Sequence, residues 1–332
     1  MSANYLNDRE IKERMRDEFI MFTKIVDINT KNGCACNNNC VFCASSPREG
    51  CHDDYINPQD SETERVKLEL HKPRLKKTKV VYFTASGGEP TLRKDIIELL
   101  SYANELGYKQ IYLQTNGRMF CYPEFTKRVV DAGCNSTQIS LHAHSAELYD
   151  RITRAPGSFE QTVQGIKNLL QYRDEIVIEI SVLFNKMNYK HLPAIARFIC
   201  KEFKGIDEVK FYPVDPAGTA PENHQKLLVR MSVVKPYLEK ALAILASRGF
   251  NFAISFMPYC VIDKKYWRDI SSKVTRNKGF VTYKSPPRSA KESHCVIFKS
   301  CEGCVMKEKC PGIWQSYTSR VGTDEFKPIS SV

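Results

Sequence analysis

The sequence contains no long apolar run. No stretch of eighteen consecutive apolar residues occurs among the 332 residues, so a membrane-spanning helix is not expected. Residues 1–22 are polar and charged, unlike the apolar centre of a secretory signal. We therefore expect a globular protein of the cytoplasm, long enough to form one large domain or two smaller ones.

Acidic residues are scarce relative to basic ones. The chain has 38 Asp and Glu against 49 Lys and Arg, a formal net charge of +11. Such a balance suits anionic partners, for example nucleotides, nucleic acid or an acidic electron-transfer protein. Proteins without anionic partners can also be basic, so charge alone does not identify a partner.

Cysteine, by contrast, is abundant. Thirteen cysteines occur, and the odd number excludes a fully paired disulfide framework. Without a secretory signal, a reducing compartment is expected, where cysteines serve metal or redox chemistry. Three of them, Cys36, Cys40 and Cys43, lie close together in one loop. The sequence therefore predicts a metal centre at this loop.

The loop Cys36–Cys43 can hold one cubane iron–sulfur cluster, with one thiolate on each of three irons. Cys34 is too close to Cys36 to be the fourth ligand, which leaves one iron open to a ligand from outside the protein. A zinc site is an alternative, because short cysteine spacings also suit zinc. Chance clustering of reduced thiols is another.

Apolar segments bounded by turn residues alternate with helical patterns from residue 23 to about residue 214. Strands are predicted at 23–29, 79–85, 109–114, 136–141, 176–183 and 208–213. Helices are predicted at 61–71, 92–106, 123–132, 159–172 and 190–203. This alternation indicates an α/β fold with a parallel sheet, a partial (β/α)6 TIM-like barrel. Reactive groups of such barrels gather at the C-terminal ends of the strands, and the cysteine loop follows the first strand.

A second motif, Gly87-Gly88-Glu89-Pro90, follows the second predicted strand. The glycines allow the backbone to approach a ligand closely, and strand-end carbonyls can accept hydrogen bonds from an ammonium group. Glu89 adds a carboxylate and Pro90 stiffens the turn. An ordinary strand-to-helix turn is the alternative. The cysteine spacing together with Gly-Gly-Glu-Pro resembles the radical S-adenosylmethionine (radical SAM) superfamily.

The resemblance implies that the open iron binds the amino and carboxylate groups of SAM and that the second motif binds its amino group. By position in the family, it also implies SAM contacts from polar residues at later strand ends: Thr115, Asn116, Ser140, Arg154 and Asn185. Ordinary strand-end polar residues that bond the local backbone are the alternative. His142 and His144 suggest a metal site, but a metal role for them is not favoured.

The C-terminal part carries a further cysteine group. Residues 1–22 are taken as an N-terminal segment, 23–214 as the barrel, and 215–332 as a small cysteine-bearing region with a helix at about 235–248 and a strand-like stretch at 251–256. Cys301, Cys304 and Cys310 resemble part of the SPASM and twitch extensions, which hold auxiliary 4Fe–4S clusters in radical SAM enzymes. Trp314 replaces the next cysteine of a full SPASM, which favours a shorter, twitch-like region with one cluster.

The fourth ligand of this auxiliary cluster is predicted to be Cys260. Cys295 is the second choice, or a separate hydrogen-atom donor. Structural zinc held by the same thiolates is the alternative. Residues 326–329, near the end of the chain, are predicted to serve packing.

Residues 263–293 form a basic insert in which aromatic residues are interleaved with Lys and Arg. A solvated loop is one interpretation. The other is a lid over the barrel mouth that docks an anionic substrate.

The resemblance implies reductive cleavage of SAM by the cluster at Cys36, Cys40 and Cys43. The resulting 5′-deoxyadenosyl radical takes a hydrogen atom from the substrate. Flavodoxin or ferredoxin is the expected reductant. We expect a small anionic metabolite as substrate, in an oxidation, epimerisation or rearrangement, partly because only some 22 residues precede the first strand, too few for a leader-binding domain. Peptide or protein modification, RNA modification and a non-catalytic metal-binding module are the alternatives.

Overall fold

The computed structural model describes most of the chain. The described residues are 23–27, 35–43, 56–72, 80–84, 88–215, 223–270, 274–277, 280–283 and 295–331. Gly87 of the second motif lies outside the described residues.

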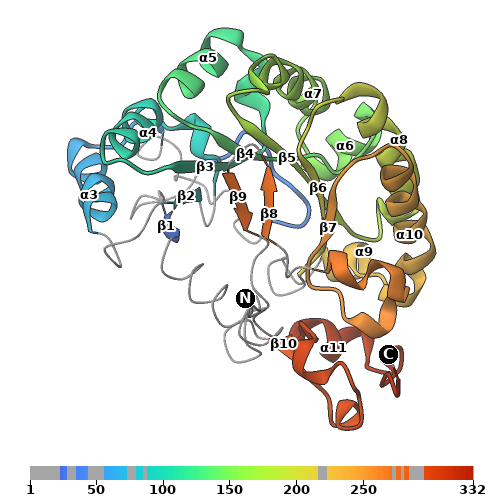
Figure 1. The fold of residues 1–332 in the computed structure, drawn as a ribbon. Helices are drawn as coiled ribbons and strands as arrows, with labels where there is room; N and C mark the ends of the chain where they lie inside the picture. The colour runs from blue at the N-terminus through green and yellow to red at the C-terminus, as the bar shows by residue number, and fades with distance from the viewer. Residues whose placement is uncertain are drawn as a thin grey trace, which may run out of the picture.

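A sheet of seven parallel strands forms the centre of the molecule (Figure 1). The strands follow one another across the sheet in chain order: β1 Thr23–Asp27, β2 Val80–Thr84, β3 Gln110–Thr115, β4 Ser136–Ser140, β5 Val177–Phe184, β6 Glu208–Pro213 and β7 Phe252–Ile254. Within the described residues β1 and β7 stand at opposite edges and do not pair with each other. The barrel is therefore open.

Helices cover the outer face of this sheet in an arc (Figure 1). They are α3 Asp60–His71, α4 Ile96–Glu105, α5 Pro123–Asp131, α6 Ala146–Thr153, α7 Ser158–Leu169, α8 Leu192–Glu202 and α10 Met231–Ser247. Short 3₁₀ turns join several of them to the sheet, among them η1 Pro90–Leu92, η2 Arg118–Cys121, η3 Leu170–Tyr172 and η4 Tyr189–His191. The short helix α9, His224–Leu227, follows β6.

The predicted fold class, a partial TIM-like barrel, is confirmed. All six predicted strands occur, with their ends within two residues of the predicted positions. Two features differ. The short helix α6 was not predicted, and the stretch predicted at 251–256 forms β7, which joins the barrel sheet beside β6. The sheet thus continues beyond residue 215, into the segment that the sequence assigned to the C-terminal region.

Side chains of β3 to β6 alternate between two kinds. One set is apolar and fully buried, as Ile111, Ile139, Ile180 and Phe211 illustrate, and belongs to the main hydrophobic core. Successive strand residues point to opposite faces, so the residues between them share the other, concave face. That second set is largely polar.

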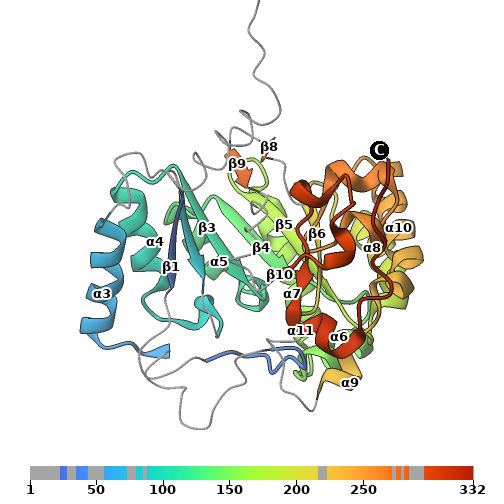
Figure 2. The same ribbon diagram turned by 90° about the horizontal axis from the view of Figure 1, so that it is seen from below.

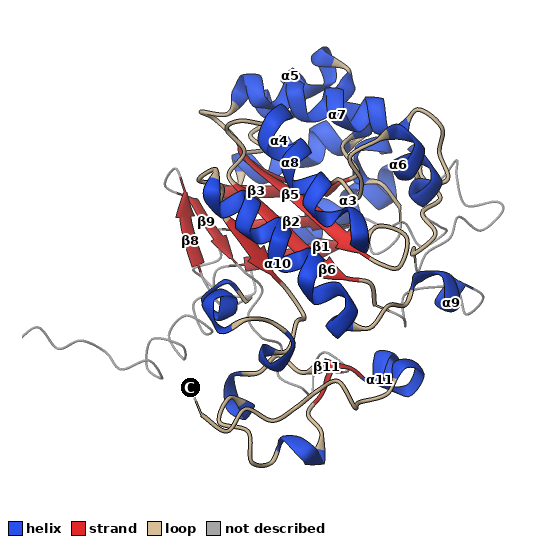
Figure 3. Ribbon diagram, turned by 90° about the vertical axis from the view of Figure 1, so that its right-hand side faces the viewer, coloured by secondary structure: helices blue, strands red, loops and turns tan. Residues whose placement is uncertain are grey.

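The C-terminal region is built mainly of loops and short elements, as Figure 3 shows. It contains β10 Cys295–Val296 paired antiparallel with β11 Ile313–Trp314, and α11 Gln315–Val321. Its 3₁₀ turns are η9 Lys299–Cys301 and η10 Lys307–Lys309. Tyr317 fastens it to the barrel, because its hydroxyl oxygen accepts a hydrogen bond from the backbone N–H of Met231 at 3.0 Å. Phe326 is buried against Phe298, which agrees with a packing role at this position.

The basic insert has regular structure that its sequence did not suggest. It begins with the 3₁₀ helix η8 Lys264–Asp269, followed by the antiparallel hairpin of β8 Val274–Asn277 and β9 Phe280–Tyr283. In Figure 2 this hairpin and α9 lie at opposite ends of the parallel strands. Of the described helices, none combines the length and apolar character needed to cross a membrane.

Candidate functional site

The cysteine loop is held by backbone hydrogen bonds to the end of α6. The N–H groups of Asn39 and Val41 donate to the carbonyls of Thr153 and Ile152, at 2.8 and 2.9 Å. These carbonyls belong to the last turn of α6, where no intrahelical donor is available for them. The loop therefore caps the C-terminal end of α6, the helix that was not predicted from the sequence.

The three thiols of the loop are half-buried, and none is in a disulfide. Burial, and after it the nearby Glu89 and Cys43, raise the pKa of Cys36 to about 12. The pKa of Cys40 is also raised, by burial and then by Cys36 and Cys43. The thiols thus lie close enough to oppose one another's ionisation. A bound cationic centre would reverse this effect and hold them as thiolates.

The second motif joins this loop at the ends of β1 and β2. The backbone N–H of Glu89 donates to the carbonyl of Ala35, immediately before Cys36, at 2.7 Å. Gly88 has a φ of 109°, a conformation that is open to glycine and strained for other residues. The two sequence motifs therefore meet in space, as predicted.

The carboxylate of Glu89 is fully buried and accepts four hydrogen bonds from the protein itself. Its Oε1 accepts from the Thr91 N–H at 3.1 Å and from the hydroxyls of Thr91 and Thr115 at 2.7 and 2.6 Å. Its Oε2 accepts from the N–H of Asn116 at 2.7 Å. Burial raises the pKa of Glu89, and these donors oppose the rise. The side chain braces η1 against the end of β3.

Asn116 extends this brace to the cysteine loop. Its side-chain amide donates to Oδ1 of Asn37 at 2.7 Å and lies 3.7 Å from Sγ of Cys36. Thr115 and Asn116, both predicted to contact SAM, are therefore engaged in positioning the loop. Whether they also contact SAM stays a prediction.

Arg118 is a residue that the sequence analysis missed. Its guanidinium donates to the carbonyl of Asn37 and, at 2.9 Å, to Oδ1 of Asn38. Nε of the same group donates to Gln161 of α7 at 2.7 Å. The arginine places a positive charge beside the cysteine loop and ties it to α7. It belongs to no local motif, so the sequence alone offered no signal for it.

Two of the other predicted SAM contacts lie at strand ends. Ser140 ends β4, with its hydroxyl 3.4 Å from that of Ser181. Asn185 follows β5 and is fully buried, and its Oδ1 accepts from the N–H of Met187 at 2.8 Å. Its Nδ2 has no hydrogen-bond partner within the described part of the chain. Because a buried amide N–H rarely stays unbonded, this donor fits a ligand such as SAM at this edge.

Arg154, the remaining predicted SAM contact, is exposed and ends α6 in a left-handed conformation with a φ of 52°. It follows Thr153, whose carbonyl holds the cysteine loop. A non-glycine residue in this conformation is strained, and such strain often accompanies a functional site. Its contact with SAM stays a prediction.

The two histidines have different surroundings. Nδ1 of His142 accepts a hydrogen bond from the N–H of Leu183 at 3.1 Å, and its ring meets Phe42 edge-on at 5.0 Å. Burial lowers the pKa of His142 to about 4, so the ring is neutral. His144 stacks instead on His191 at 5.4 Å. A shared metal site of His142 and His144 has no support in these contacts.

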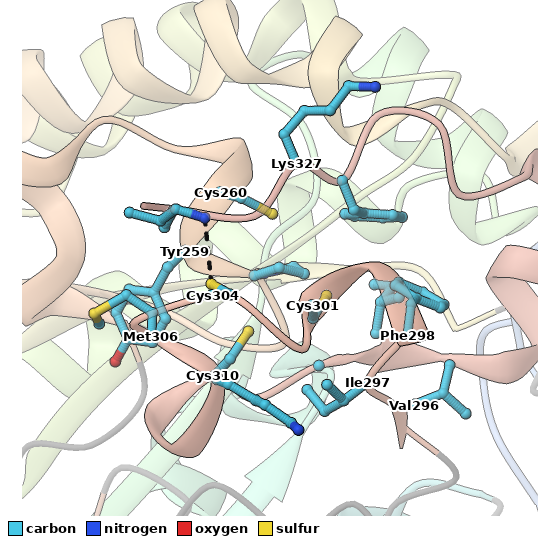
Figure 4. Close-up of a pocket in the computed structure, with 16 residues that line it drawn as sticks. Tyr259, Cys260, Val296, Ile297, Phe298, Cys301, Cys304, Met306, Cys310 and Lys327 are labelled. Atoms are coloured by element: carbon cyan, nitrogen blue, oxygen red, sulfur yellow. Dashed lines mark hydrogen bonds between the residues drawn. The ribbon is translucent and has the colours of Figure 1, made fainter. Parts of the chain in front are cut away.

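The C-terminal thiols form a second group. Cys260, Cys301, Cys304 and Cys310 line one pocket, shown in Figure 4 with apolar neighbours such as Phe298. Burial, and after it Cys310 and Cys301, raise the pKa of Cys260 to about 11. The structure thus brings together the four cysteines that the sequence grouped, and the thiol chosen as fourth ligand is among them.

Val296, the residue after Cys295, lines that pocket, whereas the side chain of Cys295 lies outside the described part of the structure. Cys295 lies in β10 opposite Trp314. The backbone N–H of Ile329 donates to Sγ of Cys304 at 3.3 Å. In the described ranges, no group of three or more Cys, His, Asp or Glu side chains is arranged to hold a single metal ion.

Solved structures show the same fold. SuiB from Streptococcus suis matches 83% of this chain and 61% of its own, with a TM-score of 0.51 and 16% identity. The structure described as native anSMEcpe with bound AdoMet and Cp18Cys peptide matches 70% of this chain and 63% of its own, with the same TM-score and identity. At this identity the similarity concerns the fold alone.

Sequence comparisons identify relatives. A probable GTP 3′,8-cyclase of Methanocaldococcus jannaschii is 30% identical over 201 residues, which are 60% of this chain and 63% of the relative. One of Saccharolobus islandicus (strain L.S.2.15 / Lassen #1) is 27% identical over 209 residues, 62% of each chain. The match thus spans less than two thirds of these relatives' length. The profile of the Radical SAM superfamily matches residues 33–199, half of this chain. This protein therefore belongs to the radical SAM superfamily.

Proposed function

We propose that this protein reductively cleaves SAM and abstracts a hydrogen atom from a small anionic metabolite. One observation carries the proposal. The loop of Cys36 is bonded through Asn116 to Glu89, so that the cysteine motif and the Gly-Gly-Glu-Pro motif form a single hydrogen-bonded unit at the strand ends. A metal-binding module without SAM chemistry has no need for this second motif.

In this proposal Cys36, Cys40 and Cys43 hold a 4Fe–4S cluster, which when bound supplies the electron for SAM cleavage. The remaining residues position and enclose the reaction. Glu89 and Asn116 hold the cysteine loop against the motif that receives the SAM amino group, and Asn185 offers its unbonded N–H to the cofactor. Neutral His142 packs on Phe42 within the loop. Such fixed positioning of cofactor and substrate contributes much of the rate.

An auxiliary 4Fe–4S cluster at Cys260, Cys301, Cys304 and Cys310 is part of the proposal. Four thiols line one pocket, and their surroundings are mostly apolar. Four thiolates satisfy a cubane cluster completely, so this centre would conduct electrons. Structural zinc would use the same ligands and is distinguished by metal analysis.

Two observations support an anionic substrate. The chain carries a net charge of +11, and a groove of about 340 Å³ is lined by Lys190, Arg197 and Lys240 together with His191 and without an acidic side chain. The groove lies at the N-terminal end of α8, where the helix dipole also favours anions. The relatives named as GTP 3′,8-cyclases agree with a nucleotide-like class.

The test is anaerobic formation of 5′-deoxyadenosine from SAM with a chemical or flavodoxin-type reductant. The reconstituted wild-type protein is expected to form it, and a variant with Cys36, Cys40 and Cys43 all replaced by Ala is not. Replacing the half-buried Cys200 with Ala serves as control, because this thiol belongs to neither cysteine group. Product formation by the triple variant at the wild-type rate would defeat the proposal.

A further inference from the structure

The concave face of the barrel is polar where the interior of such barrels is ordinarily filled by branched apolar residues. The pairing register places these side chains side by side: Gln138 of β4 is opposite Glu179 of β5, which is opposite Glu208 of β6. Further along, Ser140, Ser181 and Lys210 form the next row. None of these residues belongs to the cysteine motifs.

Exposure along this face increases toward the C-terminal ends of the strands. Gln110 is 4% exposed on β3, whereas Gln114 is exposed. Likewise Lys210 is 6% exposed on β6, and Tyr212, two residues further, is half-buried. The concave face thus opens at the end where the cysteine loop lies, and its deeper part is an enclosed polar floor.

Glu179 is at the centre of this floor. Its Oε2 accepts from Nζ of Lys210 at 2.5 Å and from the hydroxyl of Tyr112. Its Oε1 has no hydrogen-bond partner among the described residues, although the side chain is fully buried. The same holds for Oε1 of Gln110 on the same face. A buried carboxylate oxygen without a donor is costly, so a donor from outside the chain is expected at this point.

The charge of the floor indicates what kind of donor fits. Glu179 and Glu208 face one lysine, whose Nζ lies 3.7 Å from Oε2 of Glu208. Burial alone lowers the pKa of Lys210, but Glu179, Tyr212 and Glu208 together raise it above the ordinary value, so the lysine stays charged. The Glu179 oxygen without a partner among the described residues is part of a carboxylate, which carries negative charge. It would repel a phosphate or carboxylate and attract a positive group.

The floor also lies close to Ser140, one of the predicted SAM contacts. Ser181, whose hydroxyl is 3.4 Å from that of Ser140, is two residues beyond Glu179 on β5. Two strand residues span about 7 Å, so a group bound at Glu179 lies about 7 Å from the level of Ser140 and Ser181, toward the N-terminal ends of the strands.

We propose that the substrate presents a cationic nitrogen donor, an alkylammonium or guanidinium group, to Oε1 of Glu179. This inference rests on the proposed function and refines its substrate. The part of the molecule that enters the barrel is positive, and any anionic part stays outside this floor. Lys210 holds Glu179 in place by a hydrogen bond to Oε2, the other oxygen of the Glu179 carboxylate.

The test is binding of small probes to the cluster-reconstituted protein with SAM and without reductant. The probes are ethylguanidinium and n-propylammonium, with propionate and inorganic phosphate as anionic counterparts, and affinities are measured by ligand-observed NMR. The cationic probes are expected to bind wild type, and Glu179→Gln to weaken them about tenfold or more, as loss of a charged acceptor does. Asp207→Asn is the control, because this buried carboxylate instead accepts the backbone N–H of Ile178.

If Glu179→Gln fails to fold because Lys210 is left without its partner, the double variant Glu179→Gln/Lys210→Met removes both charges and is expected to lose the same binding. Equal probe affinity in the wild type and a folded variant would overturn the inference. So would no binding of the cationic probes to the wild type, since water alone would then serve Oε1. Failure of the wild type to form 5′-deoxyadenosine would instead defeat the proposed function, which these binding measurements do not use.

Discussion

Replacing Glu89 with Gln would test whether this carboxylate is the brace between the two motifs. Glutamine keeps the shape, and its oxygen can serve the three donors at the Oε1 position. The glutamine nitrogen then faces the backbone N–H of Asn116, which in the wild type donates to Oε2 of Glu89 at 2.7 Å. Two hydrogen-bond donors therefore oppose each other in the variant. Loss of one charge-assisted bond together with a buried unbonded N–H is expected to cost about 3 to 6 kcal/mol.

That cost is a large fraction of the roughly 5 to 15 kcal/mol that stabilises a typical domain. Urea denaturation without the cluster measures it, and amide hydrogen exchange at Asn116 reports the local opening. Glu64→Gln is the matched control. Glu64 forms an exposed pair with Lys67 at 3.0 Å, and its loss is expected to change stability by less than about 1 kcal/mol. An effect of Glu89→Gln as small as that of the control, with unchanged exchange at Asn116, would refute the brace.

Three further predictions concern packing, pH and the second thiol group. Gly165→Ala should lower the free energy of unfolding, measured in urea, by about 1 to 3 kcal/mol, because a Cβ there would lie 2.3 Å from the backbone oxygen of Gly117, just before η2. Gly303→Ala is the control and should leave the free energy of unfolding unchanged, because the space around Gly303 is open. The pKa of His142 is about 4 in the folded protein, against 6.5 in the unfolded chain. The neutral ring should therefore contribute up to about 3 kcal/mol to the free energy of unfolding above pH 6.5, and this contribution is lost as the pH falls toward 4. His142→Gln should flatten this dependence in denaturation measured as a function of pH. Cys260→Ala should lower the iron content of the reconstituted protein from about eight to about four atoms per chain, whereas Cys295→Ala should leave it unchanged. Equal losses of iron in the two variants would contradict the assignment of Cys260.

Much of the barrel could be predicted from the sequence because its strands are apolar runs between turn residues. β6, Glu208–Pro213, was predicted with its observed bounds. β7 was assigned to another region because three residues, Phe252–Ile254, carry too little pattern to show that they pair with β6. α6 was missed because its eight residues show barely two turns of periodicity.

The candidate site divides in the same way. Cys36 and Glu89 stand in local motifs, so their spacing in the chain reveals them. Arg118 acts through contacts with residues some 80 positions away, which no local pattern encodes. The polar floor around Glu179 was hidden for a related reason. Alternating polar residues in a strand ordinarily indicate a solvent-facing side, and only the closed-in concave face shows that these are buried.

The central claim is that SAM binds an open iron at the loop of Cys36, Cys40 and Cys43. The most direct measurement uses a variant in which Cys260, Cys301, Cys304 and Cys310 are replaced by Ala, so that only the N-terminal centre can carry a cluster. In this variant, reduced and mixed with SAM labelled with ¹⁵N in its amino group, electron paramagnetic resonance methods should detect hyperfine coupling between the cluster and the label. A reduced cluster that shows no coupling at saturating SAM would contradict the account.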